Sequence, residues 1–199
     1  MKGIALVIVD VQNDFCPGGI LAVPEGDAII PVLNKYIELF SHRKLPVFAS
    51  RDWHPERTAH FKEFGGQWPS HCVQNSSGAA FHPLLKLPDD VIILSKGMDP
   101  DTDGYSVFQA ADRDDVEFYT VLKNIAIDEL YIGGIATDYC VRWSVRDAIT
   151  FGFRVTVLVD GIKGINLKLK DSEDAIREMV ALGAKKITFE KLSHMFHEE

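Results

Sequence analysis

The sequence is short of cysteine, of positive charge and of long hydrophobic runs, and each shortage excludes a class of protein. Three cysteines are too few for a disulfide framework, so we expect a reducing compartment. Lysine and arginine total 21 against 29 aspartates and glutamates, a net charge of −8, which argues against nucleic acid or an anionic membrane as the main partner. The apolar run 4–9 stops at Asp10, too short for a signal-peptide core, and no run approaches the ~20 residues of a membrane span. We therefore expect a soluble cytoplasmic protein.

The composition is otherwise that of an ordinary globular protein. Hydrophobic residues make up 46% and charged residues 25% of the 199 positions. A chain of this length can bury a core without disulfides or a structural metal, and it fits one domain of about 100–200 residues. We predict a single domain covering residues 1–199.

Strand and helix patterns alternate along the chain. Strands are predicted at 4–9, 46–50, 91–95, 129–133, 155–159 and 187–189, and helices at 29 to about 42, 116–125, 140–151 and 171–182. This alternation predicts an α/β fold of three layers, with a six-stranded, mostly parallel sheet and helices on both faces. One long irregular region, from about 51 to 86, is rich in Gly, Pro, His, Trp and Ser. A loop of this length is often functional.

Three reactive side chains follow predicted strands. Asp10 follows the first strand, Lys96 the third, and Cys140 the turn after the fourth. Ligands of open parallel sheets bind outside the carboxyl ends of the strands, so these residues are expected on one rim.

The chemistry of these three residues suits attack on an acyl carbon. A helix start and the Lys96 ammonium would both lower the pKa of the Cys140 thiol, and Asp10 could take its proton. Backbone N–H groups of Ala136 and Cys140 could hold the developing oxyanion. A lone free cysteine is more often a packing residue, but the coincidence of three groups favours a nucleophile.

The irregular region carries a set of metal-type ligands. Asp52 and His54 are two apart, so in an extended segment they face the same side. His60 and His71 lie further along the same loop. Carboxylate and imidazole suit Zn²⁺, and also Fe²⁺ or Mn²⁺. The spacing matches no standard zinc motif, so scattered loop residues remain the alternative.

Aromatic side chains lie near these groups in the sequence. Phe15 follows the first strand, Trp68 lies in the irregular loop, and Tyr105 comes after Lys96. Flat rings around a thiol could sandwich a flat substrate, and ordinary core filling is the alternative.

Taken in order, these motifs resemble a known family. The motif residues are 10–15 (DVQNDF), 52–54 (DWH) with His60 and His71, 68–72 (WPSHC), 96–97 (KG) and 133–141 (GGIATDYCV). Together they resemble the nicotinamidases, or pyrazinamidases, of the isochorismatase-like cysteine hydrolases. The likeness runs from Ile4 to about Phe189. Tyr139 departs from relatives that carry His before the nucleophile.

The resemblance implies a fold, a reaction and a set of site residues. The fold is isochorismatase-like and Rossmann-like, and the reaction converts nicotinamide to nicotinate and ammonia through a thioester, in NAD salvage, with pyrazinamide as a second substrate. The implied roles are a catalytic triad of Asp10, Lys96 and Cys140, oxyanion donors at Ala136 and Cys140, substrate contacts at Phe15, Leu21, Trp68, Tyr105 and Ile135, and metal ligation by Asp52, His54, His60 and His71. A cis peptide between Ile135 and Ala136 is also implied.

The resemblance also implies a cofactor and a partner. One divalent metal is expected, zinc first, with iron or manganese as alternatives; its other ligands are waters, and the substrate ring nitrogen displaces or bonds one of its ligands. The expected partner is the small molecule nicotinamide, with no nucleic acid and no membrane. The chain is a monomer or a homo-oligomer.

Two other functions stay open at this stage. One is another amide or ester hydrolase of the same superfamily, such as an isochorismatase, which would not need the metal loop. The other is a metal-binding or interaction protein on this fold that has lost activity, which the presence of Asp10, Lys96 and Cys140 argues against. Whether His60 is a direct ligand is likewise open.

Overall fold

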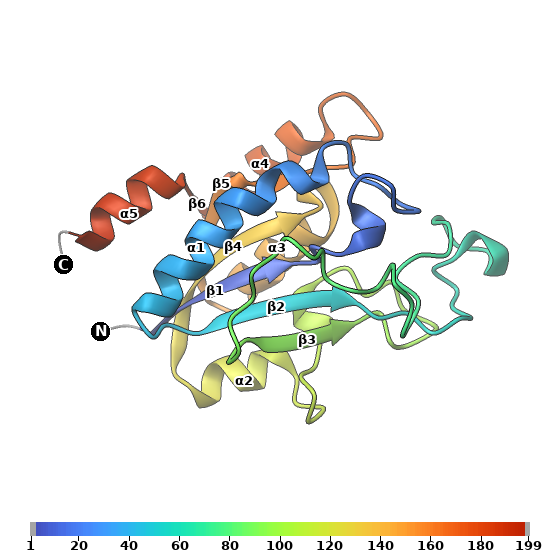
Figure 1. Ribbon diagram of the computed structural model, residues 1–199, viewed down its shortest axis with the longest axis horizontal. Helices are drawn as coiled ribbons and strands as arrows, with labels where there is room; N and C mark the ends of the chain where they lie inside the picture. Colours follow the sequence, from blue (N-terminus) through green and yellow to red (C-terminus); the bar gives the residue numbers. More distant parts are fainter. Residues whose placement is uncertain (1–2, 198–199) are drawn as a thin grey trace.

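The protein is built on one six-stranded sheet, seen in a computed structural model that describes residues 3–197 (Figure 1). The strands lie in the order β3-β2-β1-β4-β5-β6, and every neighbouring pair is parallel. Their bounds are β1 Gly3–Val9, β2 Val47–Asp52, β3 Ile92–Lys96, β4 Ile127–Ile135, β5 Arg154–Lys163 and β6 Lys185–Ile187. The predicted six-stranded α/β architecture is confirmed, and its sheet is parallel throughout.

Helices cover both faces of the sheet and complete three layers (Figure 1). Their bounds are α1 Ile30–His42, α2 Phe118–Asn124, α3 Arg142–Thr150, α4 Asp171–Ala181 and α5 Phe189–His197. One hydrophobic core lies under α1 and α5, and a second lies under α2, α3 and α4. Within residues 3–197, no helix has the length and apolar character needed to cross a membrane.

Alternation along the central strand explains how one sheet serves two cores. Successive side chains of a strand point to opposite faces. In β1, Leu6 and Ile8 belong to the core under α1, while Val7 and Val9 belong to the opposite core. A strand buried on both faces therefore appears in the sequence as the continuous apolar run that predicted it.

The predicted elements need correction mainly at their ends. Strand β2 reaches Asp52 and β3 reaches Lys96, so two predicted site residues are the last residues of strands. The helix predicted at 116–125 begins only at Phe118, and β4 and β5 are longer than predicted. Between β2 and β3, a stretch that the structure describes in full, the chain has only a short 3₁₀ turn, Lys62–Phe64, in agreement with the predicted long loop.

The prediction for the end of the chain is wrong. The sixth strand ends at Ile187, and Phe189 begins helix α5, which was not predicted. The Phe189 N–H donates to Oδ2 of Asp160, at 2.8 Å, and its ring packs edge-on against Tyr36. Leu192 and Phe196, four residues apart, are buried against the core. Tertiary contacts of α5 with α1 therefore decide the conformation of this segment.

The strand order places the site. Successive strands are added on one side of β1 up to β3 and on its other side from β4 onward, so the strand order reverses between β1 and β4. In such sheets the crevice forms at the carboxyl ends of the two strands beside this switch point. Asp10 follows β1 and Ala136 follows β4. Gly134 has φ +128°, and a Cβ there would lie 2.1 Å from the carbonyl oxygen of Val9, so only glycine lets the two strands approach so closely.

Candidate active site

Asp10, Lys96 and Cys140 meet in a buried cluster at the switch point, and we refer to them as the triad. Lys96 Nζ lies 2.8 Å from Asp10 Oδ2 and 3.5 Å from Cys140 Sγ. All three are buried, and Asp10 is also held by Ser50, whose Oγ donates to Asp10 Oδ1 at 2.7 Å. The sequence prediction that these residues share one rim is confirmed by their positions.

Lys96 also bonds Asp52 and so connects the triad to the predicted metal ligands. Its ammonium donates to Oδ1 of Asp52. Burial alone would lower the pKa of Lys96, but Asp10 and Asp52 outweigh it and raise that pKa well above its usual range. Burial would raise the pKa of Asp52, yet the Lys96 ammonium, with the neighbouring His54 and His71 rings, holds it well below the usual range. Lys96 is therefore charged, and Asp52 is a carboxylate.

The predicted direction of the thiol pKa is wrong. Burial raises the pKa of Cys140 well above its usual value, the nearby Asp10 and Asp52 carboxylates add to the rise, and the Lys96 ammonium only opposes it. Burial likewise raises the pKa of Asp10. The sequence could place a cation and Asp10 near the thiol, but it could not show how deeply the thiol is buried or that Asp52 adds a second carboxylate there. In the resting protein the thiol keeps its proton, next to a carboxylate with a strengthened affinity for protons.

The turn that carries Cys140 begins directly after Ala136 and folds back onto it. The helix predicted at 140–151 is divided into a π-helical turn, Thr137–Val141, and α3. The carbonyl of Ala136 accepts hydrogen bonds from the N–H groups of Tyr139 and Val141, both at 3.1 Å, which closes the turn around Cys140. The expected cis bond between Ile135 and Ala136 is present.

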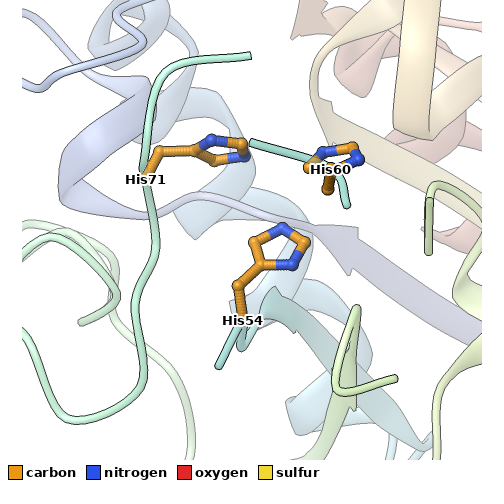
Figure 2. Close-up of side chains that lie close together, drawn as sticks. All are labelled: His54, His60 and His71. Carbon is orange, nitrogen blue, oxygen red and sulfur yellow. The ribbon is translucent and has the colours of Figure 1, made fainter. Parts of the chain in front are cut away.

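Three histidines from the irregular loop form a second cluster beside the triad, which we call the histidine cluster. His54, His60 and His71 point into one shared space (Figure 2), and one ring nitrogen from each lies within 4.8 Å of the others. Asp52 Oδ2 faces the same space, 3.6 Å from His54 Nε2 and 3.7 Å from His71 Nε2. Three of the four predicted metal ligands thus share one space, and Asp52 lies at its edge, beside His54 and His71.

The hydrogen bonds of the three rings fit a metal site. The Nδ1 atoms of His54 and His71 lie 3.0 Å and 2.8 Å from the carbonyl oxygens of Gly97 and Pro69, which can only accept. Each neutral ring therefore donates from Nδ1 and keeps a lone pair on Nε2. His54 Nε2 is buried without a hydrogen-bond partner among the described residues. Metal-bound histidines have this arrangement, with the second nitrogen held by a carbonyl or carboxylate.

The third ring shares this chemistry. Nδ1 of His60 lies 3.4 Å from Oδ1 of Asp103. Burial, followed by the neighbouring His54 and His71, lowers the pKa of His60 to about 4, so its ring is neutral and able to ligate near neutral pH. Three imidazoles with a carboxylate at their edge are a donor set that suits Zn²⁺, Fe²⁺ or Mn²⁺.

A narrow pocket joins the thiol to the histidine cluster. It is lined by every residue predicted to contact substrate, namely Phe15, Leu21, Trp68, Tyr105 and Ile135, together with Ala136, Cys140, Asp52, His60 and His71. Trp68 is fixed in the wall because its Nε1–H donates to the Tyr105 hydroxyl at 2.8 Å, and Tyr139 packs edge-on against it, with ring centroids 5.0 Å apart.

Sequence reasoning assigned no substrate contact to two wall residues, Tyr139 and Ile165, and no role to Asp138. Ile165 lines the pocket from the loop after β5, and Asp138 holds that loop by accepting the N–H groups of Ile165, at 2.9 Å, and Asn166, at 2.7 Å. The rule that ligands bind at strand ends could have pointed to the segment after β5. Nothing in the local sequence marks Ile165 itself.

Comparison with known proteins gives the family. The isochorismatase domain family matches residues 4–191. The chain belongs to the isochorismatase family. A nicotinamidase of Escherichia coli K12 is 42% identical over 196 residues, which cover 90% of this chain and 92% of that relative.

Solved structures of this family agree in fold and extent. The pyrazinamidase of Pyrococcus horikoshii, solved in complex with zinc, superposes with a TM-score of 0.86 at 45% identity, covering 94% of this chain and 99% of its own. PnC1 from L. infantum, solved in complex with nicotinate, has a TM-score of 0.82 at 30% identity and covers 94% and 93% of the two chains. This isochorismatase-family chain therefore resembles the nicotinamidases and pyrazinamidases along nearly its whole length.

Proposed function

We propose that this protein is a nicotinamidase, a cysteine amidohydrolase that converts nicotinamide to nicotinate and ammonia. The single observation that carries the proposal is the buried contact of Lys96 with both Asp10 and Cys140 at the end of a narrow pocket lined by aromatic rings. The nicotinamidase and pyrazinamidase relatives support the same activity. The proposal treats residues 1–199 as one catalytic domain in which the loop of about 51–86 supplies the metal ligands.

The first half of the reaction forms a thioester. Asp10 accepts the thiol proton of Cys140, and the charged Lys96 stabilises the thiolate as it attacks the carboxamide carbon. The N–H groups of Ala136 and Cys140 hold the oxyanion of the tetrahedral intermediate. Asp10 then gives its proton to the leaving nitrogen, which departs as ammonia. The raised pKa of Asp10 suits the first of these tasks, because a stronger base takes the thiol proton more readily.

The second half of the reaction restores the enzyme. A water molecule, deprotonated by Asp10, attacks the thioester carbonyl, the same two N–H groups hold the oxyanion, and the thiolate of Cys140 leaves. Asp10 returns the proton to this thiolate, so the products of this step are the free thiol and nicotinic acid, which ionises to nicotinate. Overall one amide bond and one water molecule are consumed, and one carboxylic acid and one ammonia are formed.

The pocket walls would hold the substrate ring between Phe15 and Trp68, with Leu21, Tyr105 and Ile135 around its edge. Asp52, His54, His60 and His71 would hold one divalent metal, zinc first, with iron or manganese as alternatives. When bound, this metal would supply a Lewis acid that binds the ring nitrogen and orients the ring. An isochorismatase would not need these four ligands, so they favour the amidase. Pyrazinamide has the same carboxamide and a similarly placed ring nitrogen, and we propose it as a second substrate.

The product gives the reaction its place in metabolism. Nicotinate is a pyridine carboxylate from which NAD can be rebuilt, so the proposed role is NAD salvage.

The test is ammonia release from nicotinamide by purified protein loaded with zinc, run beside Cys140→Ala. We expect release from the wild type and a loss of at least about 10⁴-fold in the variant, which removes the nucleophile. Circular dichroism and zinc content of the variant should match the wild type. Release that survives the substitution would refute Cys140 as the nucleophile, and absence of release from the zinc-loaded wild type would refute the activity.

A further inference from the structure

Two polar residues next to Asp10 are buried and take no part in the proposed chemistry. Gln12 and Asp14 lie two and four positions after Asp10, in the motif 10–15 that follows strand β1. Gln12 is fully buried and Asp14 is 6% exposed. Burial of an amide and a carboxyl group is unfavourable unless each is hydrogen-bonded, so their partners indicate what they do.

Gln12 hydrogen-bonds the backbone of Asp52, the first of the proposed metal ligands in the chain. Its Nε2 donates to the carbonyl oxygen of Asp52 at 2.8 Å, and its Oε1 accepts from the N–H of Asp52 at the same distance. The same Nε2 also donates to the carbonyl of Ala79, at 2.9 Å. One side chain thus satisfies both backbone groups of Asp52, the residue at which β2 ends and the irregular loop begins. Rotation of the Asp52 backbone would break two hydrogen bonds at once.

Asp14 holds the part of the loop that carries the last of the histidine ligands. Its Oδ2 accepts from the N–H of Cys72 at 2.8 Å. Cys72 directly follows His71, and its carbonyl accepts from the N–H of His54 at 3.0 Å. The carboxylate of Asp14 therefore fixes the one peptide segment that adjoins His71 and is bonded to His54.

We propose that Gln12 and Asp14 are positioning residues that hold the metal-binding loop in place beside the carboxyl end of β1, and thereby set the metal affinity of the histidine cluster. The inference rests on the proposed metal site, but not on the amidase activity. The motif then has three tasks at alternate positions: Asp10 reacts, Gln12 places Asp52, and Asp14 places His71 and His54. Partners that orient metal ligands typically change affinity about 10–100-fold when they are removed.

The sequence offers a matched control between the two residues. Asn13 makes a hydrogen bond of the same kind, from Nδ2 to the carbonyl oxygen of Ser77 at 2.8 Å, and this bond reaches no metal ligand. Asn13→Ala should therefore lower thermal stability without changing metal affinity. Asp14→Asn is the conservative variant, because its amide oxygen can still accept from Cys72 N–H.

The experiment measures zinc affinity of the full chain without substrate, by competition with a chromogenic chelator, beside the thermal unfolding temperature of the metal-free proteins. We expect the zinc Kd to rise about 10–100-fold in Asp14→Ala and in Gln12→Leu. It should stay within about threefold of wild type in Asp14→Asn, since a retained hydrogen bond preserves the geometry, and be unchanged in Asn13→Ala.

The outcomes separate positioning from simple stabilisation. An unchanged zinc Kd in Asp14→Ala, alongside a lower unfolding temperature, would overturn the inference, as would an equal rise in Asn13→Ala. If Gln12→Leu does not fold, the Asp14→Ala and Asp14→Asn pair decides the question. A wild type that fails to bind zinc refutes the inference together with the metal site. A wild type that binds zinc but releases no ammonia from nicotinamide refutes the proposed activity alone.

Discussion

The triad and the histidine cluster lie side by side, yet they are positioned by different means. Asp10 and Lys96 stand at the carboxyl ends of β1 and β3, where the ladder of a parallel sheet fixes the backbone. The histidine cluster stands on a loop without strands or α-helices. There each ring is held by a single hydrogen bond from its Nδ1, as from His54 to the carbonyl oxygen of Gly97.

This difference implies different weaknesses. A residue at the end of a buried strand moves only if the sheet moves. The geometry of the triad is therefore changed mainly by substitution of the triad side chains themselves. A ligand on an irregular loop moves when one supporting contact is lost. Substitution of a residue that only supports the loop can therefore change the geometry of the histidine cluster. Substitutions near the triad should change turnover or stability, and substitutions around the loop should change metal affinity first.

The largest effect is expected at Lys96, where the two parts meet. Lys96→Met would leave Asp10 and Asp52 buried without their cation, and removal of one partner of a buried ion pair typically costs about 3–5 kcal/mol. Urea unfolding of the metal-free protein should show that loss, together with loss of turnover. Lys191→Met, at an exposed position on α5, is the control and should leave both unchanged. A loss of less than about 1 kcal/mol in Lys96→Met would show that the pairing contributes little to stability.

Next in size is the loss of a metal ligand. His54→Ala should weaken zinc binding by more than the roughly 10–100-fold expected for an outer partner, because it removes a donor atom itself. Zinc content after dialysis and chelator competition measure this effect. His42→Ala, an exposed histidine on α1, should keep the wild-type affinity. Full zinc binding by His54→Ala would remove this residue from the ligand set.

Gly97, which lies outside the loop but next to His54, tests whether a neighbouring residue controls the position of a ligand. Gly97 has φ +67°, and a Cβ there would lie 2.4 Å from Cε1 of His54, so Gly97→Ala should displace that ring and raise the zinc Kd about tenfold or more. Gly65 also has a positive φ, +97°, but its Cβ would meet nothing within 4 Å. Gly65→Ala thus carries the backbone penalty alone. Equal zinc affinities of the two variants would contradict the account.

The smallest effect is expected at a hydrogen bond within the triad. Ser50→Ala removes the Oγ bond to Asp10 and should lower kcat about threefold to tenfold, in line with roughly 1 kcal/mol for one hydrogen bond, while leaving zinc affinity intact. Ser41→Ala is the matched control, because that buried hydroxyl has no hydrogen-bond partner among the described residues. A change in zinc affinity in Ser50→Ala would mean that the triad and the histidine cluster are not separable.

The same contrast explains what could be predicted from the sequence. Asp10 and Lys96 follow apolar runs that identify buried strands, so a rule about strand ends was enough to bring them together. The residue types suggested that the histidines bind a metal, but scattered loop residues stayed the alternative until the resemblance was used, because an irregular loop has no periodicity from which to place a side chain. Helix α5 was missed because its contacts with Tyr36 and Asp160 are distant in sequence. The rise in the thiol pKa was missed because it depends on the burial of Cys140 and on the nearness of Asp52, which only the fold shows.

The most direct test of the account compares nicotinamide with benzamide, which has the same carboxamide but no ring nitrogen. The measurement is the ratio of kcat/KM for the two amides in the zinc-loaded wild type, in Ser50→Ala and in His54→Ala. We predict a preference for nicotinamide of at least about tenfold in the wild type, which corresponds to 1.4 kcal/mol of differential binding. The preference should be unchanged in Ser50→Ala, which slows both amides equally, and lost in His54→Ala. The account would be contradicted if the preference for nicotinamide were absent from the wild type or fully retained in His54→Ala. Either result would mean that the site is not divided into a triad that performs the chemistry and a histidine cluster that recognises the ring.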